Sequence, residues 1–348
     1  MRLLNVHTFT FKEFPVDEAP PYVAASHRWT DDETCYKDVR KGKNTGTRGY
    51  QKVQRFCEAV RNTNAAAQGA ARVFGKEQSC DWLWIDTACI DKTNSVELSE
   101  SINSMFQYYA NADRCYAFLQ DVGTEADQRD TESIFQFVKS EWFARGWTLQ
   151  ELIAPGRVVF FSKQWKMLGH KCPWLECGIP IYHCDRYGPR LNSTIRIITK
   201  IPQDALTNRQ SIRLALSVFT GDDKMKWAEG RITTRPEDRA YCLLGLLDVH
   251  LPLIYGEGDG AWARLKEAVQ KKVDSDDWKP AKKSWDKIWA QSATPGCHRA
   301  TRNEVDMLTT LSYPCFDRKR VLHCAVEFDG DGDVEEQGYR SVQATQDR

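Results

Sequence analysis

Four short apolar runs, separated by stretches with helical spacing, constrain the fold of this chain more than any other feature. Each run is apolar nearly throughout, which is typical of a strand covered on both faces. The runs are Tyr22–Ser26, Trp82–Asp86, Cys115–Leu119 and Val158–Phe161. Because strands alternate with helices, the pattern predicts an α/β fold with a parallel sheet and helices on both faces. In such a sheet, ligands bind beyond the carboxyl ends of the strands.

Helical signals lie between these runs. Apolar residues recur at helical spacing after Gln51, which predicts a helix into the Ala-rich stretch before Gly75. Asn94, followed three residues later by Glu97, has the form of a capping box and predicts a helix of about four turns. The segment Ser140–Pro155 is expected to be a further helix that ends at its proline.

The second half of the chain has a different pattern and is expected to be mainly helical. The predicted elements there are a strand over Ile195–Ile201 and helices over Ser211–Trp227, Pro236–Leu247 and from Ala261 onward. We therefore expect an α/β core over residues 1–165 and a helical extension over 166–272. Residues 273–348 are expected to form a partly disordered tail or linker, because polar residues dominate and periodicity fades there.

Charge and composition exclude several classes of function. Lys plus Arg and Asp plus Glu both number 48, so no net charge favours nucleic acid. No apolar stretch is long enough to span a membrane, and the 12 cysteines include no Cys-x-x-Cys pair. These features predict reduced thiols and a cytoplasmic location. The cluster Cys172, Cys177, His183 and Cys184 lacks the paired spacing of structural zinc sites, so no metal is expected.

Glu151 is the strongest candidate for a functional carboxylate. On a helix it lies on the same face as Trp147, four residues earlier. A carboxylate that is desolvated by an aromatic neighbour has a raised pKa, which suits an acid–base or electrostatic catalyst. The alternative is a structural salt bridge between Glu151 and Arg145 or another cation. The spacing leaves both interpretations open.

The loops after the first two strands supply further candidates, since they meet at one edge of a parallel sheet. Asp86 and Asp91 could bind ribose hydroxyls or position a cation, and Arg28 could bind a phosphate. The alternative is that both aspartates cap local turns. Cys89 with His27 could form a thiol nucleophile, although a cysteine in an apolar segment is usually inert.

Four segments together resemble the fungal heterokaryon incompatibility (HET) domain. They are Tyr22–Trp29, Trp84–Lys92, Ser101–Tyr109 and Trp142–Glu151. Two later segments, Arg235–Gly245 and Pro252–Gly258, resemble the extended form of this domain. The resemblance implies a role in fungal non-self recognition, in which the domain triggers growth arrest or cell death.

HET domains are in turn distantly similar to TIR domains, which have a flavodoxin-like sheet. In TIR domains that cleave NAD, a Glu in a Trp-x-x-x-Glu context is catalytic, and Trp147–Glu151 stands at that place. This resemblance implies Glu151 as a catalytic residue of a nucleotide glycohydrolase, with NAD as a substrate and no cofactor. The candidate substrate-binding residues are Ser26, His27, Arg28, Trp29, Asp86, Cys89, Asp91, Arg145 and Trp147.

A second hypothesis has the same residues hold the fold of a signalling module that acts by self-association without chemistry. An open pocket at Glu151 would favour the enzyme, and a buried, paired Glu151 would favour the module. Either way, we expect self-association and an upstream receptor or further domains of a longer chain as partners.

Overall fold

The centre of the molecule is a seven-stranded mixed sheet with the order β2-β1-β4-β3-β5-β6-β7. The computed structural model describes residues 1–74, 79–123, 130–172, 187–207 and 212–274. The four central strands are parallel, and the strands outside them pair antiparallel. The strands are β1 (Arg2–Asn5), β2 (Phe11–Glu13), β3 (Tyr22–His27), β4 (Trp82–Trp84), β5 (Arg114–Phe118), β6 (Val158–Phe161) and β7 (Met167–Lys171). The predicted α/β class and all four predicted parallel strands are confirmed.

Helices of one to about seven turns pack around this sheet and continue the chain after its last strand. Those in the first half are η1 (Val16–Glu18), α1 (Tyr36–Lys41), α2 (Arg48–Phe74), α3 (Asp86–Cys89), α4 (Ser95–Ala110), α5 (Asp130–Val138), η2 (Glu141–Ala144) and α6 (Thr148–Ile153). Those in the second half are α7 (Asn192–Thr199), α8 (Gln203–Leu206), α9 (Ile212–Leu216), α10 (Gly221–Lys226), α11 (Asp238–Tyr241), α12 (Leu244–Leu247) and α13 (Gly260–Asp274). The expected helical character of the second half is confirmed for its described residues.

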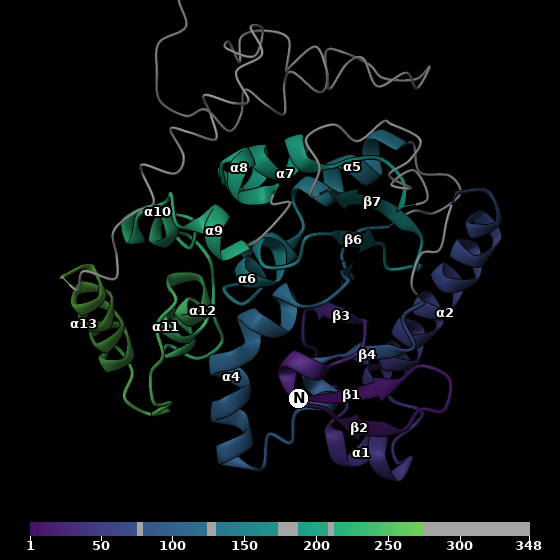
Figure 1. Cartoon of the computed structure of the whole chain (residues 1–348), viewed down its shortest axis with the longest axis horizontal. Helices are drawn as coiled ribbons and strands as arrows, with labels where there is room; N and C mark the ends of the chain where they lie inside the picture. Colours follow the sequence, from purple (N-terminus) through teal and green to yellow (C-terminus); the bar gives the residue numbers. More distant parts are fainter. Residues whose placement is uncertain (75–78, 124–129, 173–186, 208–211, 275–348) are drawn as a thin grey trace, which may run out of the picture. The chain divides into compact units, whose positions relative to one another are not determined.

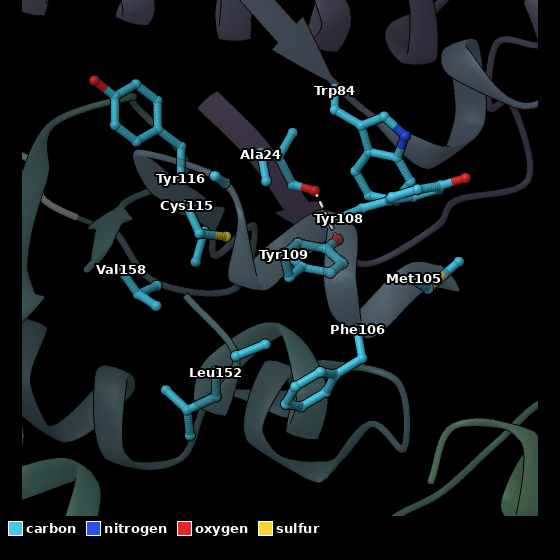
Figure 2. Close-up of a cluster of buried hydrophobic side chains, with 14 of the residues drawn as sticks. Ala24, Trp84, Met105, Phe106, Tyr108, Tyr109, Cys115, Tyr116, Leu152 and Val158 are labelled. Atoms are coloured by element: carbon cyan, nitrogen blue, oxygen red, sulfur yellow. Dashed lines mark hydrogen bonds between the residues drawn. The ribbon is translucent and has the colours of Figure 1, made fainter. Parts of the chain in front are cut away.

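Consecutive residues of β3 show that helices cover both faces of the sheet. Successive side chains on a strand point to opposite faces. Ser26 bonds to Glu151 of α6, whereas the ring of His27 lies 6.0 Å from that of Phe56 on α2. Figure 1 accordingly shows α2 on one side of the central strands and α4 and α6 on the other. The alternation continues on β5, where Cys115 and Tyr116 point in opposite directions (Figure 2).

The segment around Glu151 differs from the predicted single helix over Ser140–Pro155. It consists of two short helices, η2 and α6, with a break at Arg145 and Gly146. The break pairs with a distant strand-like residue: Gly146 N donates to Ile232 O at 2.9 Å, and Ile232 N donates to Ala144 O at 2.7 Å. This pairing replaces helical hydrogen bonds with long-range ones, so helical spacing alone did not reveal the break.

Three further predictions about the chain were wrong in detail. The predicted strand Ile195–Ile201 is largely helix α7, because its isoleucines pack at helical spacing despite their preference for strands. The predicted helix Ser211–Trp227 is divided into α9 and α10, the latter begun by a capping box at Thr220. The predicted helix after Pro236 is divided into α11 and α12. The tail from residue 275, with its tryptophans, lies outside the described residues.

Gly245 on α12 allows close packing against α4. A Cβ at this position would lie 2.0 Å from Cβ of Phe106, a fully packed residue of α4. We therefore expect Gly245→Ala to lower the free energy of unfolding by about 3 kcal/mol, since such an overlap forces the helices apart. Gly46→Ala is the matched control, because its Cβ would meet nothing within 4 Å. Urea unfolding of both variants tests this packing, and an unchanged midpoint for Gly245→Ala would contradict it.

Candidate functional site

Glu151 lies in the first turn of α6, directly over the carboxyl end of β3. Its Oε2 accepts a hydrogen bond from Oγ of Ser26, the penultimate residue of that strand. Oγ of Ser26 in turn accepts from Nε1 of Trp142 at 2.8 Å. These three side chains form a donor chain that ends on the carboxyl group: indole to hydroxyl, and hydroxyl to Glu151. Nearby, the Tyr109 hydroxyl donates to Ala25 O at 2.9 Å and also interacts with Glu151.

Burial raises the pKa of Glu151 to about 8, and the negative charge of Asp86 acts in the same direction. The hydrogen bond from Ser26 and the positive charge of Arg145 oppose these effects without offsetting them. The residue is only 8% exposed. Among the described residues, no ion pair joins Glu151 to a cation. Glu151 is therefore a buried carboxyl group that holds its proton at neutral pH, because the nearby positive charge does not offset the cost of burying its ionised form.

The predicted rise in pKa is confirmed, and burial is its largest cause. Trp147, the expected neighbour, is the residue before α6, and its side chain hydrogen-bonds to Asp238. The indole that reaches the site is that of Trp142. Residue spacing did not identify Trp142 as part of the site, because it does not indicate that η2 turns this indole toward Ser26.

Arg145 contributes to the site through its charge rather than through an ion pair. The predicted salt bridge with Glu151 is absent from the part of the chain that the structure describes. The carbonyl oxygen of Arg145 accepts hydrogen bonds from Oγ1 of Thr148 and Nη1 of Arg231, each at 2.9 Å. These two bonds fix the break between η2 and α6, and so fix the helix that carries Glu151.

Asp86 and Trp29 are brought together at the same edge of the sheet. Nε1 of Trp29 donates to Oδ2 of Asp86 at 3.0 Å, and Nζ of Lys92 lies 3.5 Å from the same oxygen. The Lys92 ammonium also lies 3.5 Å from the centroid of the Trp29 ring, a cation–π contact. Since Asp86 influences Glu151 electrostatically, Trp29, Lys92 and Asp86 belong to one site with Ser26 and Glu151.

The contacts of Asp91 and Cys89 stabilise the local structure. Oδ1 of Asp91 accepts from N and Oγ1 of Thr93, at 3.0 and 2.6 Å, which is the local capping arrangement that formed the alternative prediction. Cys89 is buried, and burial raises its thiol pKa to about 12. Its Sγ bonds to the backbone of Ile85 and Leu83. A thiolate nucleophile is not formed in this environment.

His27 points away from Glu151, and Arg28 is held by a carboxylate at the surface. Nε2 of His27 lies 3.5 Å from Oε2 of Glu33, on the face of the sheet that α2 covers. Glu33 also binds Nζ of Lys52, and the contacts with His27 and Lys52 lower the pKa of Glu33 to about 2 although burial opposes them. Arg28 forms a surface ion pair with Glu141. His27 is thus separated by the sheet from the carboxyl group that its neighbour Ser26 contacts.

Besides Trp142, two residues of the site were missed by sequence reasoning. Lys92 was part of a recognised motif, but nothing in its spacing indicated a contact with Trp29. Tyr109 lies on the helix predicted after Asn94 but was not a candidate, and Figure 2 shows its ring within a cluster of buried side chains, beside Trp84 and Tyr108. Of the cysteine–histidine cluster, Cys177, His183 and Cys184 lie outside the described residues, so the absence of a metal remains a prediction.

Comparison with known proteins finds a matching family model and a similar vegetative incompatibility protein. Residues 22–133 match the family model "Heterokaryon incompatibility protein (HET)". The chain is 41% identical over 265 residues to the vegetative incompatibility protein HET-E-1 of Podospora anserina. That alignment covers 75% of this chain and 17% of the relative's length. No solved structure matches.

The family match begins at β3 and ends within α5, so it includes Ser26, Trp29, Asp86 and Lys92 but stops before Glu151. The longer alignment extends well beyond the length of that match. In the described part of the chain, no helix has the length and apolar character needed to cross a membrane. By its matched domain and by its similarity to this relative, the chain is a heterokaryon incompatibility (HET) domain protein.

Proposed function

We propose that this HET domain acts in fungal non-self recognition, as part of heterokaryon incompatibility, and triggers cell death by cleaving the N-glycosidic bond of NAD at Glu151. One observation carries the chemical part of this proposal: Glu151 is a buried carboxyl group that forms no ion pair with any residue that the structure describes. A structural carboxylate in such a place is normally paired, because an unpaired buried charge is costly. A group kept in this state is a candidate for a functional acid or base.

A substrate cation would supply the partner that Glu151 lacks. In oxidised NAD, the bond to be broken joins ribose C1′ to a positively charged pyridinium nitrogen. A positive charge at that position stabilises the ionised form of a nearby carboxyl group. The proposal therefore predicts selection for the cationic N-glycoside, since a neutral one leaves Glu151 protonated.

The reaction follows from this arrangement. The C1′–N bond breaks, and its electron pair leaves with neutral nicotinamide, so the leaving group needs no acid. The ionised Glu151 stabilises the oxocarbenium-like ribose and takes a proton from the water that adds to C1′. Asp86 lies at the same edge and would bind the ribose hydroxyls, while the exposed ring of Trp29 would stack on a base.

The pH dependence of this reaction has a definite sign. Because burial raises the pKa of Glu151 to about 8, the reactive ionised form in the free protein becomes scarcer as pH falls. We expect kcat/KM to increase about 10-fold per pH unit up to about pH 8 and then to level off. Initial rates measured between pH 6 and 9 test this, and a flat profile below pH 8 would contradict it.

A second candidate is a signalling module that acts by self-association without catalysis. The observation in its favour is the small exposure of Glu151, whose carboxyl group is enclosed and bonded to Ser26. In the enzymatic account, the same enclosure implies that assembly opens the site. Both accounts therefore make self-association the trigger of activity.

The test compares oxidised NAD with NADH, on the isolated chain and on the chain fused to an inducible oligomerisation domain. The enzymatic proposal predicts release of nicotinamide from NAD, no release from NADH, and a higher rate on assembly. If neither form of the chain cleaves NAD while the fusion still arrests fungal growth, the signalling module is the correct account. Cleavage of both dinucleotides at equal rates would contradict the role of the substrate cation.

A further inference from the structure

Lys92 occupies a specific place at the edge of the Glu151 site. Its ammonium group lies over the Trp29 ring and within 3.5 Å of the Asp86 carboxylate. The Lys92 side chain is 31% exposed and Trp29 is 47% exposed, whereas the Asp86 side chain is 17% exposed. Trp29 and Lys92 are therefore more accessible from solvent than Asp86.

The charges around the site favour an anion at this edge. The ammonium of Lys92 is balanced by Asp86, and Glu151 is neutral in the free protein because burial raises its pKa. The positive charge of Arg145 then remains without a paired carboxylate among the described residues. Arg28 does not add to this charge, because its ion pair with Glu141 neutralises it.

We propose that Lys92, held against Trp29, determines specificity by binding a phosphate group next to a stacked base, so that the site binds nucleotides more tightly than nucleosides. The inference rests on the proposed function, which places the ribose at Glu151. It extends that function by assigning the phosphate to Lys92, a residue that takes no part in breaking the C1′–N bond. An ammonium has three donors, and a phosphate within reach gains a charge-assisted hydrogen bond from a group already ordered by the indole.

Trp29 and Lys92 act together in this recognition. Base stacking on an aromatic ring tolerates any base, because each base has a π-face. Stacking alone therefore binds nucleosides and nucleotides equally well. The phosphate contact of Lys92 is what distinguishes them, and it requires the ammonium to stay beside the ring on which the base stacks.

The test measures equilibrium binding of AMP and of adenosine, two ligands that differ only in the phosphate and lack the bond cleaved in NAD. We expect the assembled wild-type chain to bind AMP about 10-fold more tightly than adenosine. Lys92→Met keeps the aliphatic stem over the indole but removes the charge, so it should abolish this preference without weakening adenosine binding. Lys92→Arg keeps the cation and should retain the preference.

Lys37→Met is the matched control. Lys37 is a cation close to the same loop, and its Nζ donates to Oγ1 of Thr93 at 2.7 Å rather than to Asp86. This variant should bind both ligands as the wild type does. Equal binding of AMP and adenosine by the wild type, or a preference that persists in Lys92→Met, overturns the inference.

Binding of these two ligands separates this inference from the proposed reaction. If NAD is not cleaved but AMP is preferred through Lys92, the glycohydrolase proposal fails and the nucleotide site stands. If NAD is cleaved but Lys92→Met retains the preference for AMP, the reaction stands and the phosphate lies elsewhere.

Discussion

Replacing Glu151 with glutamine is expected to lower the rate of NAD cleavage by about 100-fold or more and, at the same time, to stabilise the fold. The rate falls because glutamine can accept the hydrogen bond from Ser26 but supplies no negative charge to the ribose. Most substitutions of buried groups destabilise a protein. The opposite sign here is a specific consequence of the unpaired state of Glu151.

The sign of the stability change follows from the pKa. The folded-state pKa of Glu151, about 8, lies above its ordinary value of 4.5. Between these values the unfolded chain is ionised while the folded chain keeps its proton, so Glu151 destabilises the fold increasingly as pH rises from 4.5 to 8. At pH 7 this effect is on the order of 3 kcal/mol, and glutamine removes it.

The measurement is urea unfolding of both proteins at several pH values, together with nicotinamide release. The wild type should lose stability relative to Glu151→Gln from pH 5 to 8, and the two should converge below pH 4.5. Glu267→Gln is the matched control, since this exposed glutamate pairs with Lys271 on α13. A variant that loses several kcal/mol at pH 7 would instead identify Glu151 as a structural ion-pair partner.

Lys171 gives the second large expected effect, with the opposite dependence on pH. This lysine of β7 is completely buried, and burial lowers its pKa to about 7. Its Nζ donates to Pro155 O at 2.6 Å and to Ile153 O at 3.4 Å, so it caps the carboxyl end of α6. Between pH 7 and 10.5 the folded state binds fewer protons than the unfolded state, and stability rises with pH.

We expect Lys171→Met to remove this rise. Relative to the variant, the wild type should gain on the order of 2 kcal/mol between pH 7 and 9, measured by urea unfolding. Comparing the two proteins isolates Lys171 from Lys224, whose pKa burial also lowers, to about 8, and which both proteins contain. Lys200→Met, on the exposed end of α7, is the control. Parallel stability curves for the wild type and Lys171→Met would contradict the assignment.

The sequence predicted the parallel core because its strands are buried on both faces and therefore read as continuous apolar runs. It did not predict β1, β2 or β7, whose mixed residues pair at the outside of the sheet. The break between η2 and α6 depends on hydrogen bonds with Ile232, far away in the chain, which no local pattern encodes. Local spacing can indicate a helix but cannot exclude such a competing partner.

For the site, the sequence predicted the elements that meet but not how the side chains pair. Glu151, Ser26, Trp29 and Asp86 were all candidates, and the structure brings them to one edge. The direction of each side chain depends on the alternation along β3, which puts Ser26 and His27 on opposite faces of the sheet. It also depends on the conformation of η2, which turns the indole of Trp142 toward Ser26. These directions follow from tertiary packing, which residue spacing does not specify.

The protonation state of Glu151 tests the central claim most directly. Carboxyl carbons can be followed by NMR in protein labelled with ¹³C-glutamate, and the Glu151 signal is identified by its absence from the Glu151→Gln spectrum. The account predicts that this carboxyl group is protonated at pH 6 and titrates near pH 8. If the signal is already that of a carboxylate at pH 6 and titrates near the ordinary value of 4.5, Glu151 has a counter-charge and the account is wrong.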